Sequence, residues 1–89
     1  MQAHKPYVYA VAISFDSKYF VSAGGDNTVR VWDLKKMILE TAFQGHTHWV
    51  NAVAISYNGR YVVSGSCDNS VRVWNFQQKR QEILFQRKK

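Results

Sequence analysis

The sequence is poor in cysteine and contains no long hydrophobic run. Its single cysteine, Cys67, excludes an internal disulfide framework and is typical of a protein from a reducing compartment. The N-terminal residues lack the charged, apolar and small-residue segments of a secretory signal, and no apolar run approaches the ~20 residues that a membrane span needs. We therefore expect a soluble protein, or a piece of one, that has no membrane contact. The expected location is the cytoplasm, with the nucleus as the alternative.

Acidic residues are also scarce, with six Asp and Glu against twelve Lys and Arg, and the net charge is +6. Residues 79–89 hold five of the basic residues and Glu82 as their only acid, so most of the excess lies at the C-terminal end. A basic cluster can bind nucleic-acid phosphate. The tail at residues 87–89 is short, however, and a solvated terminus is the simpler interpretation. Contact with RNA or DNA is therefore the less favoured function.

The composition that remains is suited to a packed core. Hydrophobic residues make up 46% of the chain and include five Tyr, five Phe and three Trp, so residues 4–86 are expected to be ordered. A chain of 89 residues forms one small domain at most. Folding at this size hides only roughly 60–65% of the unfolded surface, so the stability of the chain on its own should be marginal.

The chain repeats itself with a period of 42 residues. Residues 3–44 align with residues 45–86 without a gap, and the stretch Asp26–Asp33 (DNTVRVWD) returns as Asp68–Asn75 (DNSVRVWN). A fixed period of this length predicts a repeat architecture. Nineteen residues of the first unit recur unchanged: His4, Val8, Ala10 to Ser14, Tyr19, Val21, Ser22, Asp26, Asn27, Val29 to Trp32, Glu40, Phe43 and Gln44.

Each unit contains four short stretches that are rich in β-branched and aromatic residues and are separated by turn signals. The predicted strands are residues 7–14, 19–23, 29–34 and 38–43, then 49–56, 61–65, 71–76 and 82–86. Short connections demand antiparallel neighbours, so each unit should be a four-stranded meander. A helical interpretation fails because no window shows apolar residues at helical spacing.

Both faces of the third strand in each unit are apolar. Alternation places Val29 and Val31 on one face, with Trp32 and Leu34 on the other. A meander that is apolar on both sides is expected to lie between two similar sheets, as it does in a stacked or radial array.

These features together resemble the WD-repeat β-propeller family, whose repeats open with Gly-His and close with Trp-Asp. The resemblance implies an all-β fold class with two four-stranded antiparallel β-meander blades of a β-propeller. The expected divisions are a first blade at residues 1–44, a second at 45–86 and a basic tail at 87–89. The residues that carry the resemblance are Ala3-His4 and Trp32-Asp33 in the first unit, and Gly45-His46 and Trp74-Asn75 in the second.

In that family a buried hydrogen-bond chain links a loop His, a second-strand Ser or Thr, a turn Asp and a third-strand Trp. The resemblance implies such a chain in each unit. Its chemistry is sound, because a hydroxyl can accept the indole N–H and donate to an imidazole whose other nitrogen reaches a carboxylate. By position, the implied residues are His4, Ser22, Asp26 and Trp32, then His46, Ser64, Asp68 and Trp74.

Ser, His and Asp also occur together in catalytic triads. A triad needs an exposed, activated serine beside an oxyanion hole, whereas here the set occurs twice at identical spacing with a Trp each time. We therefore predict a structural network and no enzymatic activity. His46, His48 and Cys67 make a weak zinc set because there is one cysteine and no paired carboxylate nearby. No metal or cofactor is predicted.

The favoured function is a non-catalytic protein–protein interaction scaffold, as the resemblance implies. On the family pattern, partners are contacted three and five residues after the loop His and one residue before the turn Asp. Aromatic residues at such positions supply large, rigid contact areas. For Trp49, packing against a neighbouring blade is an equal alternative. The partner-binding positions are Tyr7, Tyr9 and Gly25 in the first unit, and Trp49, Asn51 and Cys67 in the second.

Two blades cannot close a propeller, which typically has four to eight. The favoured explanation is that the chain is a fragment of a longer propeller protein. The alternative is a self-assembling ring of two-blade chains, in which three chains give six blades or four give eight. The expected partners are thus other proteins or peptides on the loop face, together with further WD repeats, from the same parent chain or from other copies, that complete the ring.

Overall fold

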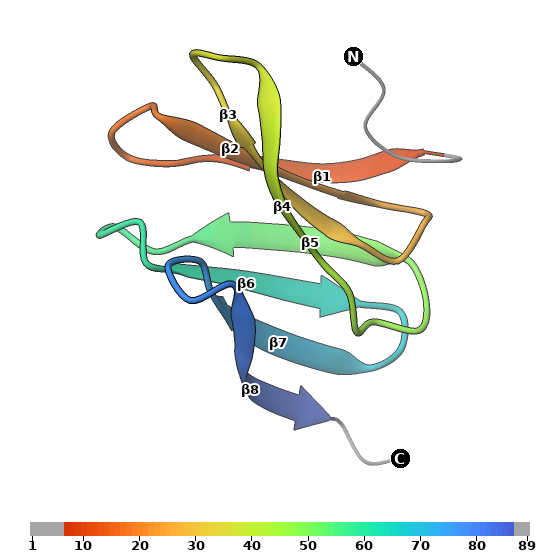
Figure 1. The fold of residues 1–89 in the computed structure, drawn as a ribbon. Coiled ribbons are helices and arrows are strands. Elements are labelled where there is room, and N and C mark those ends of the chain that lie inside the picture. Colours follow the sequence, from red (N-terminus) through yellow and green to blue (C-terminus); the bar gives the residue numbers. More distant parts are fainter. Residues whose placement is uncertain (1–6, 87–89) are drawn as a thin grey trace.

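The computed structural model describes residues 7–86, which form two four-stranded antiparallel sheets (Figure 1). Within each sheet every strand pairs with the next one along the chain, so both sheets are meanders and the predicted fold class is confirmed. His4 and the tail at 87–89 lie outside the described residues. The first sheet contains β1 (Val8–Ile13), β2 (Tyr19–Gly24), β3 (Val29–Asp33) and β4 (Ile38–Phe43). The second contains β5 (Val50–Ile55), β6 (Tyr61–Ser66), β7 (Ser70–Asn75) and β8 (Arg80–Gln86).

The strands differ from the predicted ones only at their ends. The largest difference is at β8, which begins at Arg80 rather than residue 82 because Arg80 and Gln81 pair with Asn75 and Trp74 of β7. The described residues include no helix of the length and hydrophobicity that crossing a membrane requires.

The turn before the third strand of each sheet follows from its Asp-Asn sequence. Asn27 and Asn69 have φ angles of 69° and 68°, the left-handed region that asparagine tolerates better than most residues. In the first turn Asp26 Oδ1 accepts a hydrogen bond of 3.1 Å from the amide of Thr28. The equivalent bond from Ser70 to Asp68 measures 2.8 Å, so each aspartate closes its own turn.

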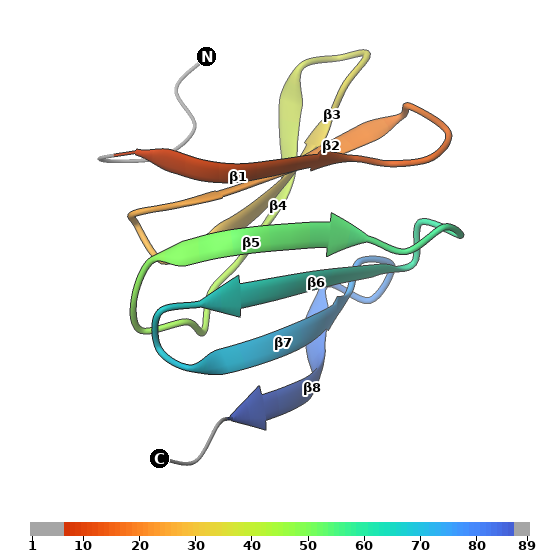
Figure 2. The same ribbon diagram turned by 180° about the vertical axis from the view of Figure 1, so that it is seen from behind.

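The core lies between the two sheets, where one face of blade 1 (β1–β4) covers one face of blade 2 (β5–β8). Strands β1 and β5 run side by side in both views (Figures 1 and 2). The rings of Phe43 and Trp74 stack at 4.9 Å, and Tyr19 meets Phe76 edge-on at 5.0 Å. Each blade contributes six residues to this core. We call the six from blade 1 the covering group and the six from blade 2 the covered group. The covering group is Tyr19, Val21, Ala23, Val29, Val31 and Phe43, and the covered group is Val50, Val53, Ile55, Val62, Trp74 and Phe76.

The remaining apolar faces are open within the described part of the chain. On blade 1 the side chains of Val11 and Ile13 are exposed, and on blade 2 those of Val71 and Phe85 are exposed. Each blade therefore has one face in the shared core and one face in contact with solvent. The expectation that each meander lies between two others is met on one side only.

Candidate functional site

A chain of hydrogen bonds links four side chains in blade 2. The indole N–H of Trp74 donates to Ser64 Oγ at 2.8 Å, and Ser64 Oγ lies 2.7 Å from His46 Nε2. On the other side of the imidazole ring, His46 Nδ1 lies 3.0 Å from Asp68 Oδ2. The structure thus brings His46, Ser64, Asp68 and Trp74 together, from the β4–β5 connection, β6, the β6–β7 turn and β7.

Only one proton arrangement satisfies every group in this network while the imidazole is neutral. An ionised carboxylate can only accept, so His46 Nδ1 carries the hydrogen and donates it to Asp68. Nε2 is then an acceptor and takes the hydroxyl hydrogen of Ser64, whose oxygen accepts from Trp74. Ser70 is a further member of the network, which was not predicted from the sequence. Its Oγ lies 3.1 Å from His46 Nδ1 and donates a hydrogen bond to Asp68 Oδ1.

The electrostatics agree with a neutral histidine beside an ionised aspartate. Burial lowers the pKa of His46 below its ordinary value, although the hydrogen bond and charge of Asp68 act in the opposite direction. Burial alone would raise the pKa of Asp68. Hydrogen bonds from Ser70, His46 and the amide of Thr47 outweigh that effect and hold the pKa of Asp68 well below its ordinary 3.8.

Blade 1 contains the corresponding pair and turn. Trp32 Nε1 donates to Ser22 Oγ at 2.9 Å, and Asp26 Oδ1 accepts from the hydroxyl of Thr28 at 2.7 Å. Asp26 also forms an ion pair with Arg30 at 3.3 Å. The fourth residue that the resemblance implies, His4, lies outside the described residues.

Gly45 lies against the side chains of Arg72 and Trp74. A Cβ atom at this position would come within 2.8 Å of Arg72 Nη1 and 3.1 Å of Trp74. The guanidinium end of Arg72 can move, but Trp74 is held by its stack and its hydrogen bond. The glycine of the Gly45-His46 pair therefore lets the chain approach Trp74 and place His46 beside Ser64.

This geometry is not that of a catalytic serine. Ser64 is fully buried, and its hydroxyl is engaged by both Trp74 and His46. An attacking serine must instead be free to reach a substrate. Among residues 7–86 no group of three or more His, Cys, Asp or Glu side chains is placed to hold a metal ion.

The predicted partner-binding residues gather at one end of the two blades, which we call the loop end. It comprises Tyr7, the starts of β1 and β5, the β4–β5 connection at 44–49, and the turns at 25–28 and 67–69, on the right in Figure 1. The turns at 14–18 and 56–60 lie at the opposite end.

Exposed aromatic rings cross from blade 1 to blade 2 at the loop end. The rings of Tyr7 and Tyr9 are 6.1 Å apart, and that of Tyr9 is 5.5 Å from Trp49. His48 extends the row with a ring contact of 5.1 Å to Trp49. The exposed fractions of Tyr7, Tyr9 and Trp49 are 63%, 40% and 46%. Trp49 thus packs against Tyr9 of the other blade and still presents about half of its surface to solvent.

Two of the other three predicted positions, Gly25 and Cys67, are tied to this row by backbone hydrogen bonds, and the third, Asn51, contacts Cys67 through its side chain. The amide of Gly25 donates to the carbonyl of Tyr7, and the amide of Cys67 donates to that of Trp49, both at 2.9 Å. Asn51 Nδ2 lies 3.4 Å from the exposed Sγ of Cys67.

A β-bulge redirects one residue in the first strand of each blade, a feature that was not among the predictions from the sequence. In the pairing of β1 with β2, Val8 and Ala10 face successive residues, which leaves Tyr9 as the extra residue. The same irregularity in β5 leaves Asn51 extra. A bulge bends its strand and redirects the side chain beside it, so Tyr9 and Asn51 sit at equivalent kinks on the loop end.

The buried network holds the loop end in place. Asp68 accepts a hydrogen bond of 3.0 Å from the amide of Thr47, which fixes the connection that leads to Trp49. The amide of Asp68 itself bonds to Ser66 Oγ, so the turn that carries Cys67 is tied at the same point. The network therefore supports the surface on which the aromatic row lies.

Two successive four-stranded meanders, each with an Asp turn before its third strand and a buried Ser–Trp hydrogen bond, are blades of the β-propeller class. The WD40 family, described as "WD domain, G-beta repeat", matches residues 1–33 and 37–75, which together make up more than half of the chain. The chain belongs to the WD40 family, which confirms the resemblance found in its sequence.

Two relatives match shorter stretches. Over 44 residues, 49% of this chain, it is 41% identical to the serine/threonine-protein kinase VPS15 of Arabidopsis thaliana. Over 36 residues, 40% of this chain, it is 47% identical to the small ribosomal subunit protein RACK1 of Schizosaccharomyces pombe (strain 972 / ATCC 24843). The matched parts cover 3% and 12% of those proteins, so the chain spans a small part of either. The kinase and ribosomal names describe those proteins, and residues 7–86 contain no kinase catalytic domain.

Proposed function

We propose that this chain is a non-catalytic scaffold that binds a protein or peptide at its loop end. WD40 domains typically mediate protein interactions, and the observation that carries the proposal here is the row of exposed rings formed by Tyr7, Tyr9 and Trp49. The row spans both blades, so a partner that lies along it contacts both repeats rather than one.

The physical character of the row supports this function. Tyrosine and tryptophan are enriched among the residues that dominate binding energy, because they offer large contact areas with few rotatable bonds. The rings here are already packed against one another, which reduces the entropy that binding must remove. Asn51 and Ser66 supply polar groups beside the row, as the rim of an interface requires.

We propose also that the two blades act as part of a larger propeller in the cytoplasm. The open apolar faces of both blades support this, since a repeat cannot bury both of its faces alone. In a fragment of a longer propeller protein, these faces would meet further repeats of the same polypeptide.

The loop-end proposal is tested with a displayed peptide library selected against the chain. The test variant is Tyr9→Ser/Trp49→Ser. The matched control is Phe15→Ser/Tyr57→Ser, which removes a second exposed aromatic pair that also joins the two blades, with ring centroids 4.3 Å apart, at the opposite end. Peptides selected on the parent should bind the control with unchanged affinity and should bind the test variant at least tenfold more weakly. The proposal would be contradicted if both variants lost affinity equally, or if neither lost affinity.

A further inference from the structure

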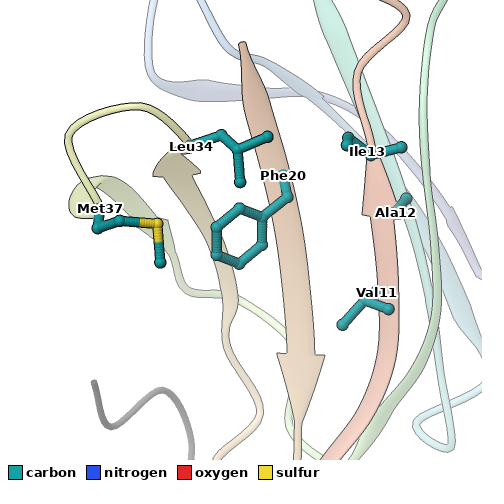
Figure 3. Close-up of a pocket in the computed structure, with 6 residues that line it drawn as sticks. All are labelled: Val11, Ala12, Ile13, Phe20, Leu34 and Met37. Carbon is teal, nitrogen blue, oxygen red and sulfur yellow. The ribbon is translucent and has the colours of Figure 1, made fainter. Parts of the chain in front are cut away.

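An apolar pocket lies on the open face of blade 1, away from blade 2 (Figure 3). In Figure 3 Phe20, Leu34 and Met37 lie on one side and Val11 and Ile13 on the other. Phe20 alternates along β2 with Val21, which belongs to the covering group, so the pocket and the covering group are on opposite faces of the sheet. The exposed fraction of Ile13 is 59%, so the pocket presents apolar surface to solvent.

The 42-residue repeat indicates what kind of surface would fit this pocket. The pocket residues Val11, Ile13, Phe20 and Leu34 are equivalent to Val53, Ile55, Val62 and Phe76. Those four residues belong to the covered group, and blade 1 packs on them. The pocket on blade 1 is therefore equivalent to the surface of blade 2 that blade 1 covers.

The corresponding occupant face exists on the open side of blade 2. Shifting the covering group by 42 residues gives Tyr61, Val63, Gly65, Val71, Val73 and Phe85, and only Gly65 in place of Ala23 is a change. Val71 and Phe85 expose 42% and 60% of their surfaces, whereas their counterparts Val29 and Phe43 are buried. The chain thus carries both halves of an interface that it forms internally once.

We propose that a second copy of this chain packs the open face of its blade 2 against the blade 1 pocket, in the geometry that blade 1 adopts on blade 2. Tyr61 of the second copy then meets Leu34 as Tyr19 meets Phe76. The contact is head-to-tail, so successive copies add in one direction until the ring closes.

The substitutions between the two surfaces are compatible with this fit. Phe20 is larger than Val62, while Leu34 is smaller than Phe76, so the receiving surface gains volume at one position and loses it at another. On the incoming surface Gly65 is smaller than Ala23. Cores tolerate such exchanges when the total volume is maintained.

The occupant to which we commit is a second copy because its blade 2 face matches the covering group at five positions of six. A further repeat in a longer polypeptide is the competing occupant. It would not be present in a sample of the 89-residue chain, which would then remain monomeric. The proposal does not depend on loop-end binding, and the Tyr9→Ser/Trp49→Ser variant should assemble like the parent.

The first measurement is the mass of the 89-residue chain by light scattering and sedimentation over a range of concentrations. We expect a discrete species of three or four chains, which corresponds to six or eight blades in a closed ring. A monomer at every concentration, or aggregates without a defined mass, would overturn the proposal.

The second measurement uses two variants that each damage one side of the interface. Ile13→Asp places a charge in the pocket, and Val71→Asp places one on the opposite open face, both at exposed positions. Each variant alone should be monomeric, because assembly needs one intact face of each kind. Mixed in equal amounts, they should form a two-chain species and nothing larger, because Ile13→Asp keeps its blade 2 face and Val71→Asp keeps its pocket.

The mixing result separates head-to-tail docking from other associations. If either variant alone assembles like the parent, or if the mixture stays monomeric while both variants melt cooperatively, the proposal is wrong. Should one variant fail to fold, Val11→Asp and Phe85→Asp repeat the test at neighbouring exposed positions on the same two faces.

Discussion

Replacing Trp74 by phenylalanine tests how much stability the buried network and the stack beneath it provide. The side chain is 3% exposed, donates to Ser64 Oγ at 2.8 Å and stacks on Phe43 at 4.9 Å. Phenylalanine keeps an aromatic ring but has no N–H group and is smaller. The substitution therefore removes one buried hydrogen bond and part of the contact between the blades.

The expected cost follows from these two losses. One buried hydrogen bond contributes about 1 kcal/mol, and the missing ring atoms correspond to roughly 2 kcal/mol of apolar burial. A domain of this size has roughly 4–13 kcal/mol of stability in total, so a loss of about 3 kcal/mol is a large share. It should lower the melting temperature by roughly 12–24 °C. Trp74→Ala should lose roughly 3–5 kcal/mol and leave little folded protein.

The other two tryptophans are controls for the same substitution, with melting followed by far-UV circular dichroism. Trp49→Phe alters a half-exposed ring and should cost less than about 0.5 kcal/mol. Trp32→Phe loses the same type of hydrogen bond, but its ring stacks on Phe20 at the edge of the open pocket, where neighbours can move into the vacated space. Its cost should be intermediate. If Trp74→Phe melts within about 3 °C of the parent, or no lower than Trp49→Phe, the proposed contribution of the network is wrong.

Three further predictions follow from the network and the turns. Acid should destabilise the chain, because the pKa values of His46 and Asp68 are lower in the folded state, so the unfolded state binds protons more readily. The stability that depends on a neutral His46 is fully present above pH 6.5 and decreases as the pH drops below that value. The stability that depends on an ionised Asp68 decreases only below pH 3.8. A urea midpoint that is unchanged between pH 7.5 and 5.5 would contradict the His46 part. Asp68→Asn should cost about 1–3 kcal/mol at pH 7, since an amide cannot accept all the bonds that the carboxylate accepts. Equal thermal stability of this variant and the parent would exclude that role. Ser17 and Gly59 are equivalent and have φ angles of 61° and 72°, a backbone conformation that strains every residue with a Cβ atom more than it strains glycine. Ser17→Gly should therefore raise the stability in thermal melts by about 1 kcal/mol, and Gly59→Ala should lower it by about the same amount. Shifts of the same sign in the two variants would refute this strain argument.

The fold could be predicted almost completely from the sequence because its signals are local and occur twice. Alternation of apolar residues defines the strands, and Asp-Asn marks the turn before β3 and β7. Because the repeat aligns without a gap, each strand and turn assigned in one unit is supported by the equivalent strand or turn in the other. The bulges at Tyr9 and Asn51 could not be predicted, since a bulge depends on which amides and carbonyls pair across the strands rather than on residue type.

The network could be predicted only as a set of positions. Ser70 joins it through His46 and Asp68, and the exchange of Thr28 for Ser70 between the units was the signal that a hydroxyl is needed there. Packing of Trp49 against a neighbouring blade was one of two alternatives, but its contact with Tyr9 could not be predicted because it depends on how the two blades pack.

Identical residues also differ in their partners, which no repeat comparison can reveal. Arg30 pairs with Asp26, whereas the equivalent Arg72 donates to Gln81 Oε1 at 2.6 Å. The position equivalent to Gln81 in blade 1 is Leu39, which offers no side-chain acceptor. One neighbouring residue thus decides where an otherwise identical side chain forms its hydrogen bonds.

The difference between the two blades connects the proposed assembly with the loop end. Trp74 is stabilised by Phe43 of the other blade, while Trp32 stacks on Phe20 of its own blade, a residue that lines an open pocket. Whatever fills that pocket binds only the folded chain and stabilises it by mass action. The loop end depends on the same folded structure. The connection that leads to Trp49 is fixed by the hydrogen bond from the amide of Thr47 to Asp68, and the ring of Trp49 contacts Tyr9 of the other blade. The melting temperature should therefore rise with protein concentration if copies assemble, and partner binding at Tyr9 and Trp49 should tighten with it.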